Sequence, residues 1–109
     1  MRQNYNKLVR DKIPAIIAAQ GDAPEVVILN DNKYEQALNA KLQEEVSEYL
    51  NGFDIEELAD ILEVIRAIAA QKGVSYEAVE KIRVAKHAER GGFLERLCLV
   101  AVERGASVE

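Results

Sequence analysis

The residues of this sequence best suited to chemistry are carboxylates, and they occur as two pairs with the same spacing. Glu45 and Glu48 lie three positions apart in "KLQEEVSEYL", and Glu57 and Asp60 are three apart in the segment that follows. Residues three apart on a helix are neighbours on its surface, so each pair can direct oxygen atoms toward one point. Hard oxygen ligands without an accompanying histidine or cysteine favour Mg²⁺ or Mn²⁺ over Zn²⁺.

The placement of these acids separates them from ordinary surface charge. At about 100° per residue around a helix, Glu45 borders the apolar stripe that contains Leu38, and Glu57 falls inside the apolar arc of the next helix. Clustered carboxylates taken out of water repel one another unless a cation or a proton compensates. We therefore predict a metal site whose ligands are Glu45, Glu48, Glu57 and Asp60.

Other acids help to define this prediction. Glu44 is a further acid that can bind a second ion or orient a water molecule, whereas Glu56 and Glu63 fall on the opposite, solvated side of their helix. An alternative remains open, in which all the acids lie on a solvated face and Glu57 only caps a helix.

Helix start and stop signals predict the elements that position these acids. A short helix starts near Pro14 and stops at Gly21, and a long helix capped by Asp31 or Asn32 ends at Asn51–Gly52. Two further helices follow, one opened by a capping box of Asp54 and Glu57 and closed at Gly73, the other capped by Ser75 and ended by Gly91–Gly92. The short connection between the second and third helices predicts that they are antiparallel neighbours, which would bring the two acid pairs together.

Two apolar stretches are the candidates for a small β element. Residues 25–29, "EVVIL", are rich in β-branched side chains and predict a short strand or extended segment, and residues 93–103 can supply a second strand to pair with it. The economical interpretation is a mainly α chain with this small β element.

Length and composition set the wider limits. A chain of 109 residues predicts one domain over 1–109, and its net charge of −5 argues against a nucleic acid polymer or an anionic membrane as partner. No apolar run is long enough to span a membrane, and the first residues lack the apolar core of a secretion signal, so we expect a cytoplasmic protein. The single Cys98 predicts a buried thiol in a reducing compartment.

Basic residues follow one face of the last predicted helix. Arg83, Lys86 and Arg90 are spaced by three and four positions, which predicts a phosphate-binding stripe, with surface pairing to Glu80 or Glu89 as the alternative. His87 is the only histidine and is expected to be a surface or packing residue. A di-iron carboxylate site is excluded because it needs Glu-x-x-His pairs.

The acid motifs carry a resemblance to a known family. "KLQEEVSEYL" followed by "EELADILEVIRAI" resembles the paired Glu-Glu-x-x-Glu and Glu-x-x-Asp motif of the MazG-like, all-α nucleoside triphosphate pyrophosphohydrolases. "YNKLVRDKIP" at 5–14 and "KHAERGGF" at 86–93 resemble the phosphoribosyl-ATP pyrophosphohydrolase-like subgroup. The resemblance implies a helical bundle that assembles as a dimer or tetramer, and Mg²⁺ bound by the four acids of the predicted site.

The resemblance also implies a reaction, the hydrolysis of a nucleoside triphosphate between its α and β phosphates to a monophosphate and pyrophosphate. Glu44 or Glu48 would accept a proton from the attacking water, Lys86 would stabilise the departing pyrophosphate, and Arg83 and Arg90 would bind phosphate with it. None of these motifs specifies a base, and members of the superfamily differ in that preference. Two other functions remain open: a regulator that binds metal and nucleotide without cleavage, and a non-catalytic helical interaction module.

Overall fold

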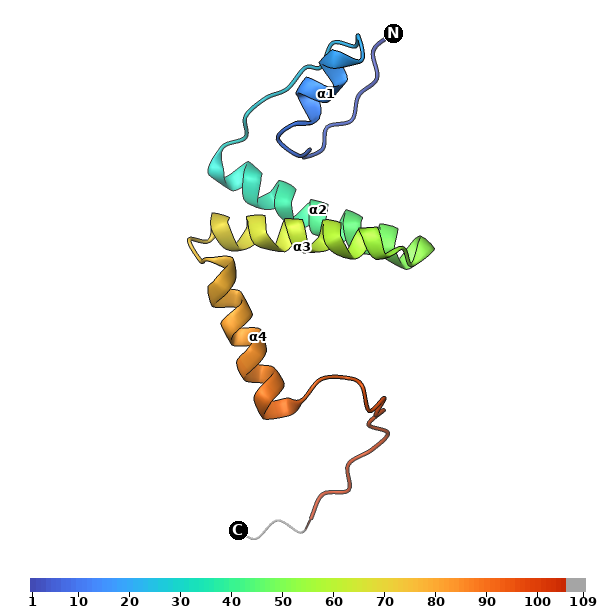
Figure 1. Cartoon of the computed structure of the whole chain (residues 1–109), viewed down its shortest axis with the longest axis vertical. Coiled ribbons are helices and arrows are strands. Elements are labelled where there is room, and N and C mark those ends of the chain that lie inside the picture. Colours follow the sequence, from blue (N-terminus) through green and yellow to red (C-terminus); the bar gives the residue numbers. More distant parts are fainter. Residues whose placement is uncertain (106–109) are drawn as a thin grey trace. The chain divides into compact units, whose positions relative to one another are not determined.

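The computed structural model describes residues 1–105 and is mainly α, as predicted from the sequence. Four helices follow one another along the chain (Figure 1): α1 (Ile13–Ala19), α2 (Asp31–Gly52), α3 (Ile55–Gln71) and α4 (Tyr76–Arg90). The chain divides into two compact units, one of Met1–Tyr76 and one that begins at Glu77. The single domain over 1–109 stays a prediction.

The long helices α2 and α3 form the packed part of the first unit. They lie side by side and run in opposite directions (Figure 1), as the short connection between them predicts. Phe53 makes the turn in a left-handed conformation with φ of 60°, and its ring stands edge-on to Tyr49 with 5.9 Å between the centroids. Leu38 of α2 and Val64 and Ala69 of α3 are the buried apolar residues of the described chain.

The helix bounds agree with the sequence signals except at the start of α2, and α3 begins after Asp54 as predicted but without a side-chain capping hydrogen bond from it. Pro14 lies in the first turn of α1, and Gly73 and Gly91 follow α3 and α4 with positive φ, a conformation that glycine adopts without a steric penalty. The cap of α2 is Asn30, whose side-chain oxygen accepts from the backbone N–H of Lys33 at 2.9 Å. The prediction of Asp31 or Asn32 as the cap is therefore wrong by one or two positions.

The predicted β element is not formed in the described part of the chain. Residues 25–29 and 93–103 contain no strand, and Ile28 is fully exposed. A strand needs a partner for its backbone N–H and C=O groups, so a β-branched composition alone does not produce one. Cys98, within the second of these stretches, is exposed, and the prediction of a buried thiol is wrong for the same reason.

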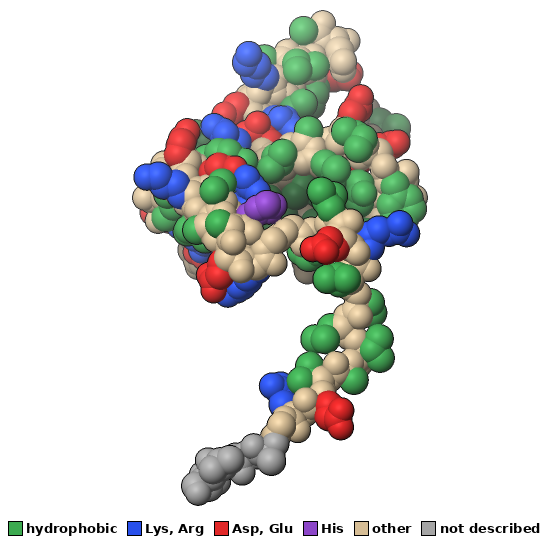
Figure 2. Space-filling view, turned by 60° about the horizontal axis from the view of Figure 1, so that its bottom comes forward, with side chains coloured by type: hydrophobic (Ala, Val, Ile, Leu, Met, Phe, Trp, Pro, Cys, Tyr) green, Lys and Arg blue, Asp and Glu red, His purple; other side chains and the backbone are tan. Residues whose placement is uncertain are grey.

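Hydrophobic side chains remain at the surface over much of the chain (Figure 2), including Leu50, Ile55 and Leu62 of α2 and α3. None of the helices in the described residues combines the length and the apolar content that a membrane crossing requires.

Candidate metal centre

Three carboxylates from two helices converge at one place in the first unit. Glu45 comes from α2, Glu57 and Asp60 come from the first two turns of α3, and each offers an oxygen atom within 4.8 Å of the others. Glu45 is 6% exposed, and Glu57 and Asp60 are half-buried. The antiparallel packing of α2 and α3 therefore unites three of the four predicted metal ligands.

Two oxygens of this cluster are buried without compensation. Within the described chain, Oε2 of Glu45 and Oε2 of Glu57 meet no hydrogen-bond donor. Burying a polar oxygen without a partner is unfavourable, and burying a charged one is more so. The donor set of carboxylate oxygens fits a hard divalent cation, which would satisfy both oxygens at once.

Glu57 responds most strongly to these surroundings. Burial raises the pKa of the Glu57 carboxyl to about 7, assisted by the negative charges of Glu48, Asp60 and Glu45 and by a side-chain hydrogen bond with Glu48. Asp54, the predicted partner of Glu57 in a capping box, makes no side-chain capping hydrogen bond. Glu57 thus belongs to the acid cluster, and the alternative that it only caps α3 is not supported.

Glu48 stands apart from the other three predicted ligands. It is exposed and contributes no oxygen to the converging group, although its carboxyl is hydrogen-bonded to that of Glu57. A hydrogen bond between two carboxyl groups requires a proton on one of them. Glu48 therefore adjoins the group of three acids through its contact with Glu57.

Glu44, next to Glu45 in the sequence, is paired with two lysines. Its oxygens accept from Lys7 Nζ at 3.1 Å and from Lys41 Nζ at 3.2 Å, and Lys41 also lies 3.3 Å from Glu45 Oε1. Burial acts to raise the pKa of Glu44, but the hydrogen bonds from Lys7 and Lys41 outweigh it and lower that pKa. Burial likewise opposes the charge of Lys41, and its two glutamate partners outweigh this and raise its pKa. Glu44 is consequently a weak base.

Asp60, the third acid of the cluster, is paired with an arginine. Arg10 Nη2 donates to Asp60 Oδ1 at 2.6 Å, and Arg10 Nη1 lies 3.7 Å from Glu63 Oε1. Sequence reasoning did not identify Lys7, Arg10 or Lys41 as part of the site. The spacing of Lys41, three and four positions before Glu44 and Glu45, is a signal that would have revealed it. The only signal for Lys7 and Arg10 is their presence in "YNKLVRDKIP".

The predicted basic stripe lies on α4, in the second unit. Arg83 donates from Nε to both carboxylate oxygens of Glu80 at 3.0 Å, and this hydrogen bonding lowers the pKa of Glu80. Lys86 and Arg90 are exposed on the same helix, and so is His87, as expected. Surface pairing, the alternative given for this stripe, is realised at Arg83.

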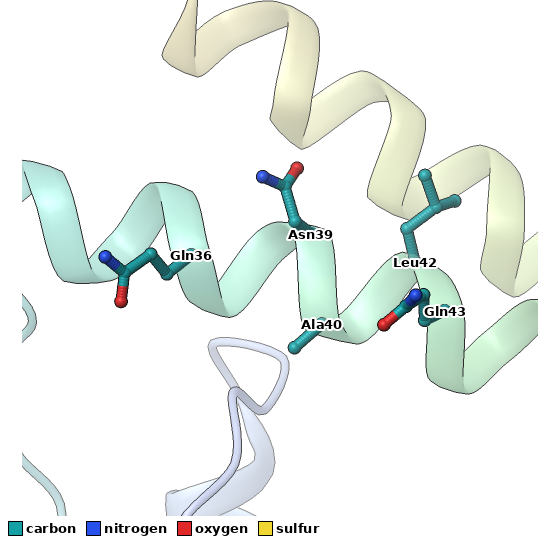
Figure 3. A pocket seen from close by; sticks show the side chains of 5 residues that line it. All are labelled: Gln36, Asn39, Ala40, Leu42 and Gln43. Carbon is teal, nitrogen blue, oxygen red and sulfur yellow. The ribbon is translucent and has the colours of Figure 1, made fainter.

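A shallow depression on α2 does not coincide with the acids. It has a volume of about 430 Å³ and is lined by five residues of α2 (Figure 3), Gln36, Asn39, Ala40, Leu42 and Gln43. Its polar side chains are neutral amides, which carry no charge to hold Mg²⁺ and do not transfer protons. The chemistry that the described residues can support therefore lies at the carboxylates.

Comparison with known proteins assigns no function to this chain. No family model and no solved structure matches the chain. A stretch of 42 residues is 52% identical to an uncharacterized protein of Mycolicibacterium smegmatis (strain ATCC 700084 / mc(2)155). That stretch is 38% of this chain and 43% of the relative, so the chain spans less than half of the relative's length.

Proposed function

We propose that this chain is a MazG-like pyrophosphohydrolase that hydrolyses a nucleoside triphosphate, or a nucleotide related to phosphoribosyl-ATP, in the presence of Mg²⁺ or Mn²⁺. The observation that carries the proposal is the convergence of Glu45, Glu57 and Asp60 between two packed helices, with two buried oxygens that have no donor. Acids on a solvated surface would not leave oxygens buried in this way.

Glu45, Glu57 and Asp60 would hold the ion, and Glu48, whose carboxyl contacts that of Glu57, would be the fourth ligand. A divalent cation bound there supplies charge neutralisation for the phosphate oxygens and for the pyrophosphate that leaves. Glu48 is the better candidate for accepting the proton of the attacking water, because it is exposed, while Glu44 is committed to Lys7 and Lys41. Attack at the α phosphorus remains an implication of the family resemblance.

The phosphate contacts predicted on α4 remain part of the proposal. Lys86 would stabilise the leaving pyrophosphate and Arg90 would bind phosphate, while Arg83 would first have to release Glu80. A cytoplasmic location, and the lack of a nucleic acid polymer as partner, also stay predictions from the sequence.

The decisive experiment is a panel of nucleoside triphosphates with Mg²⁺, in which pyrophosphate and monophosphate are both detected. We expect pyrophosphate in a 1:1 ratio with the monophosphate, and reaction in ¹⁸O-labelled water should place the label on the monophosphate. Release of orthophosphate and a diphosphate would move the attack to the γ phosphorus. Lack of turnover across the panel would contradict the proposal.

A regulator that binds Mg²⁺ and a nucleotide without cleaving it is the second candidate. The pairing of Glu44 with two lysines favours it, because that pairing weakens one of the two candidate bases. Nucleotide binding in calorimetry without any product would establish this function in place of hydrolysis.

We also propose that the chain assembles as a homodimer or homotetramer. The described residues bury only Leu38, Val64 and Ala69 among their apolar side chains, while Leu50, Ile55 and other large ones are exposed. Exposed apolar surface on this scale indicates a protein contact, and a second copy is the simplest partner. Light scattering should give at least twice 12.1 kDa at micromolar concentration. A fully active monomer would contradict this proposal.

A further inference from the structure

The N-terminal segment brings two basic side chains onto the acidic site from far away in the sequence. Lys7 contacts Glu44, 37 positions later, and Arg10 contacts Asp60, 50 positions later. They meet different helices, since Glu44 belongs to α2 and Asp60 to α3. Neither side chain has a role in the proposed function.

The charge of this segment is opposite to that of the whole chain. Residues 1–12 contain four basic residues, Arg2, Lys7, Arg10 and Lys12, and one acid, Asp11, in a protein of net charge −5. The side chains of Lys7 and Arg10 are 47% and 55% exposed, so a dissolved anion can reach them. Lysine and arginine with solvent-facing donors are the usual protein ligands of phosphate.

The contacts of Arg10 leave most of its donors available. A guanidinium has five N–H groups, and Arg10 makes one short hydrogen bond, to Asp60, and one long ion pair, to Glu63. Asp60 is also one of the three converging carboxylates. Arg10 therefore places a positive charge on a carboxylate that would also bind a divalent cation, and this charge opposes the binding of the cation.

We propose that Lys7 and Arg10 are the polyphosphate-binding arm of the candidate metal centre. Without substrate they neutralise Glu44 and Asp60; when a divalent cation takes Asp60, Arg10 turns with Lys7 to the oxygens of the polyphosphate that the cation carries. The ligand class is the polyphosphate group of a nucleotide in complex with Mg²⁺. This inference rests on the proposed function for its metal centre.

Opposite changes in two affinities distinguish this role from a structural one. Removing the positive charge of Arg10 from Asp60 favours the cation, so Arg10→Gln should bind Mg²⁺ more tightly than the wild type. The same change removes a phosphate ligand, so binding of polyphosphate should weaken. An arginine that only held the segment in place would leave the affinity for polyphosphate unchanged.

Calorimetry on the full chain tests the proposal with Mg²⁺ alone and with inorganic tripolyphosphate in excess Mg²⁺. We expect Arg10→Gln to strengthen Mg²⁺ binding several-fold and to weaken tripolyphosphate binding about ten-fold, the effect of losing one charge-assisted contact. Lys7→Gln should weaken tripolyphosphate binding by a similar factor. Arg2→Gln is the matched control, because Arg2 lies in the same segment and pairs with Glu25 at 2.8 Å, and it should change neither affinity.

The outcomes separate this proposal from the metal centre on which it rests. If both Arg10→Gln and Lys7→Gln bind tripolyphosphate as tightly as the wild type, Lys7 and Arg10 are not a polyphosphate-binding arm. That result would not contradict the metal centre. Wild-type protein that binds Mg²⁺ but not tripolyphosphate would lead to the same conclusion. Tripolyphosphate binding that depends on both side chains, in a protein that hydrolyses no triphosphate, would support the arm and contradict the hydrolase. If Arg10→Gln does not fold, as judged by circular dichroism, Lys7→Gln decides.

Discussion

The acids between α2 and α3 and the basic side chains of α4 are two charged regions of this chain, and their surroundings differ. Glu45 is buried and an oxygen of Glu57 has no donor, whereas α4 has no buried residue and its Arg83 is bonded to a glutamate one turn away. Removing a charge from water by packing a neighbouring helix over it costs free energy, which a bound ligand of opposite charge can offset. A charge on an exposed helix is satisfied by water and by nearby side chains.

The largest expected effect separates the buried acids from exposed ones on the same helix. Glu57→Gln keeps the volume of the side chain but removes one anionic oxygen, and hydrolysis should fall by about 100-fold or more. Glu56→Gln is the control, because Glu56 is exposed on the other side of α3 and should keep nearly full activity. Glu63→Gln is a less clean control, since Glu63 lies near Arg10. Equal steady-state rates in Glu57→Gln and Glu56→Gln would show that the buried acids are no more important for hydrolysis than an exposed one.

A second effect is stabilisation by the ion itself. Binding to the folded state alone adds about 2.7 kcal/mol to the free energy of unfolding when the ion is at 100 times its dissociation constant. Thermal melts with and without millimolar Mg²⁺ should show a higher midpoint, and Glu45→Gln should lose most of that shift. If calorimetry detects no ion binding even in the presence of a nucleotide, the buried acids are not a metal centre.

The pH dependence of stability sharpens the comparison further. The pKa of Glu57 is about 7 in the folded chain, above its ordinary value of 4.5, so between these values the folded state holds a proton that the unfolded state has lost. The stabilisation that protonated Glu57 contributes to the folded state is therefore fully present below pH 4.5 and is lost as the pH rises through 7. Urea unfolding without Mg²⁺ should show less stability at pH 8 than at pH 5.5, and this difference should shrink in Glu57→Gln. Affinity for Mg²⁺ should run the other way and rise with pH, because the ion displaces that proton.

The smallest expected effect concerns α4. Lys86→Gln and Arg90→Gln should raise KM by roughly three- to ten-fold with little change in stability, because an exposed cation contributes modestly to binding a phosphate. Arg83→Gln should have less effect, since Arg83 is engaged by Glu80. Steady-state kinetics at two ionic strengths would measure this, since screening by salt should reduce the differences. If these variants lost as much activity as Glu57→Gln, the basic side chains of α4 would be as important for the reaction as the acid cluster.

The sequence by itself determined the helices and the faces that they present. Pro14, Gly73 and Gly91 mark helix ends through local backbone preferences, and the helical period places Glu45 and Glu57 toward the apolar side and Glu56 away from it. Three of the four predicted metal ligands converge as the spacing and the short connection indicate. These features depend on residues close to one another in the chain.

Only the tertiary structure decided which groups meet those acids. Lys7 and Arg10 reach Glu44 and Asp60 across 37 and 50 positions, a pairing that no helical period contains. The hydrogen bond between Glu48 and Glu57 joins two helices, and Glu48 lies outside the converging group although its spacing matches that of Asp60. The stretch around Ile28 finds no strand partner, despite a composition that favours one. Local sequence sets the direction of a side chain, but its ionisation and its partners follow from desolvation and charge, which depend on whatever the folded chain places beside it.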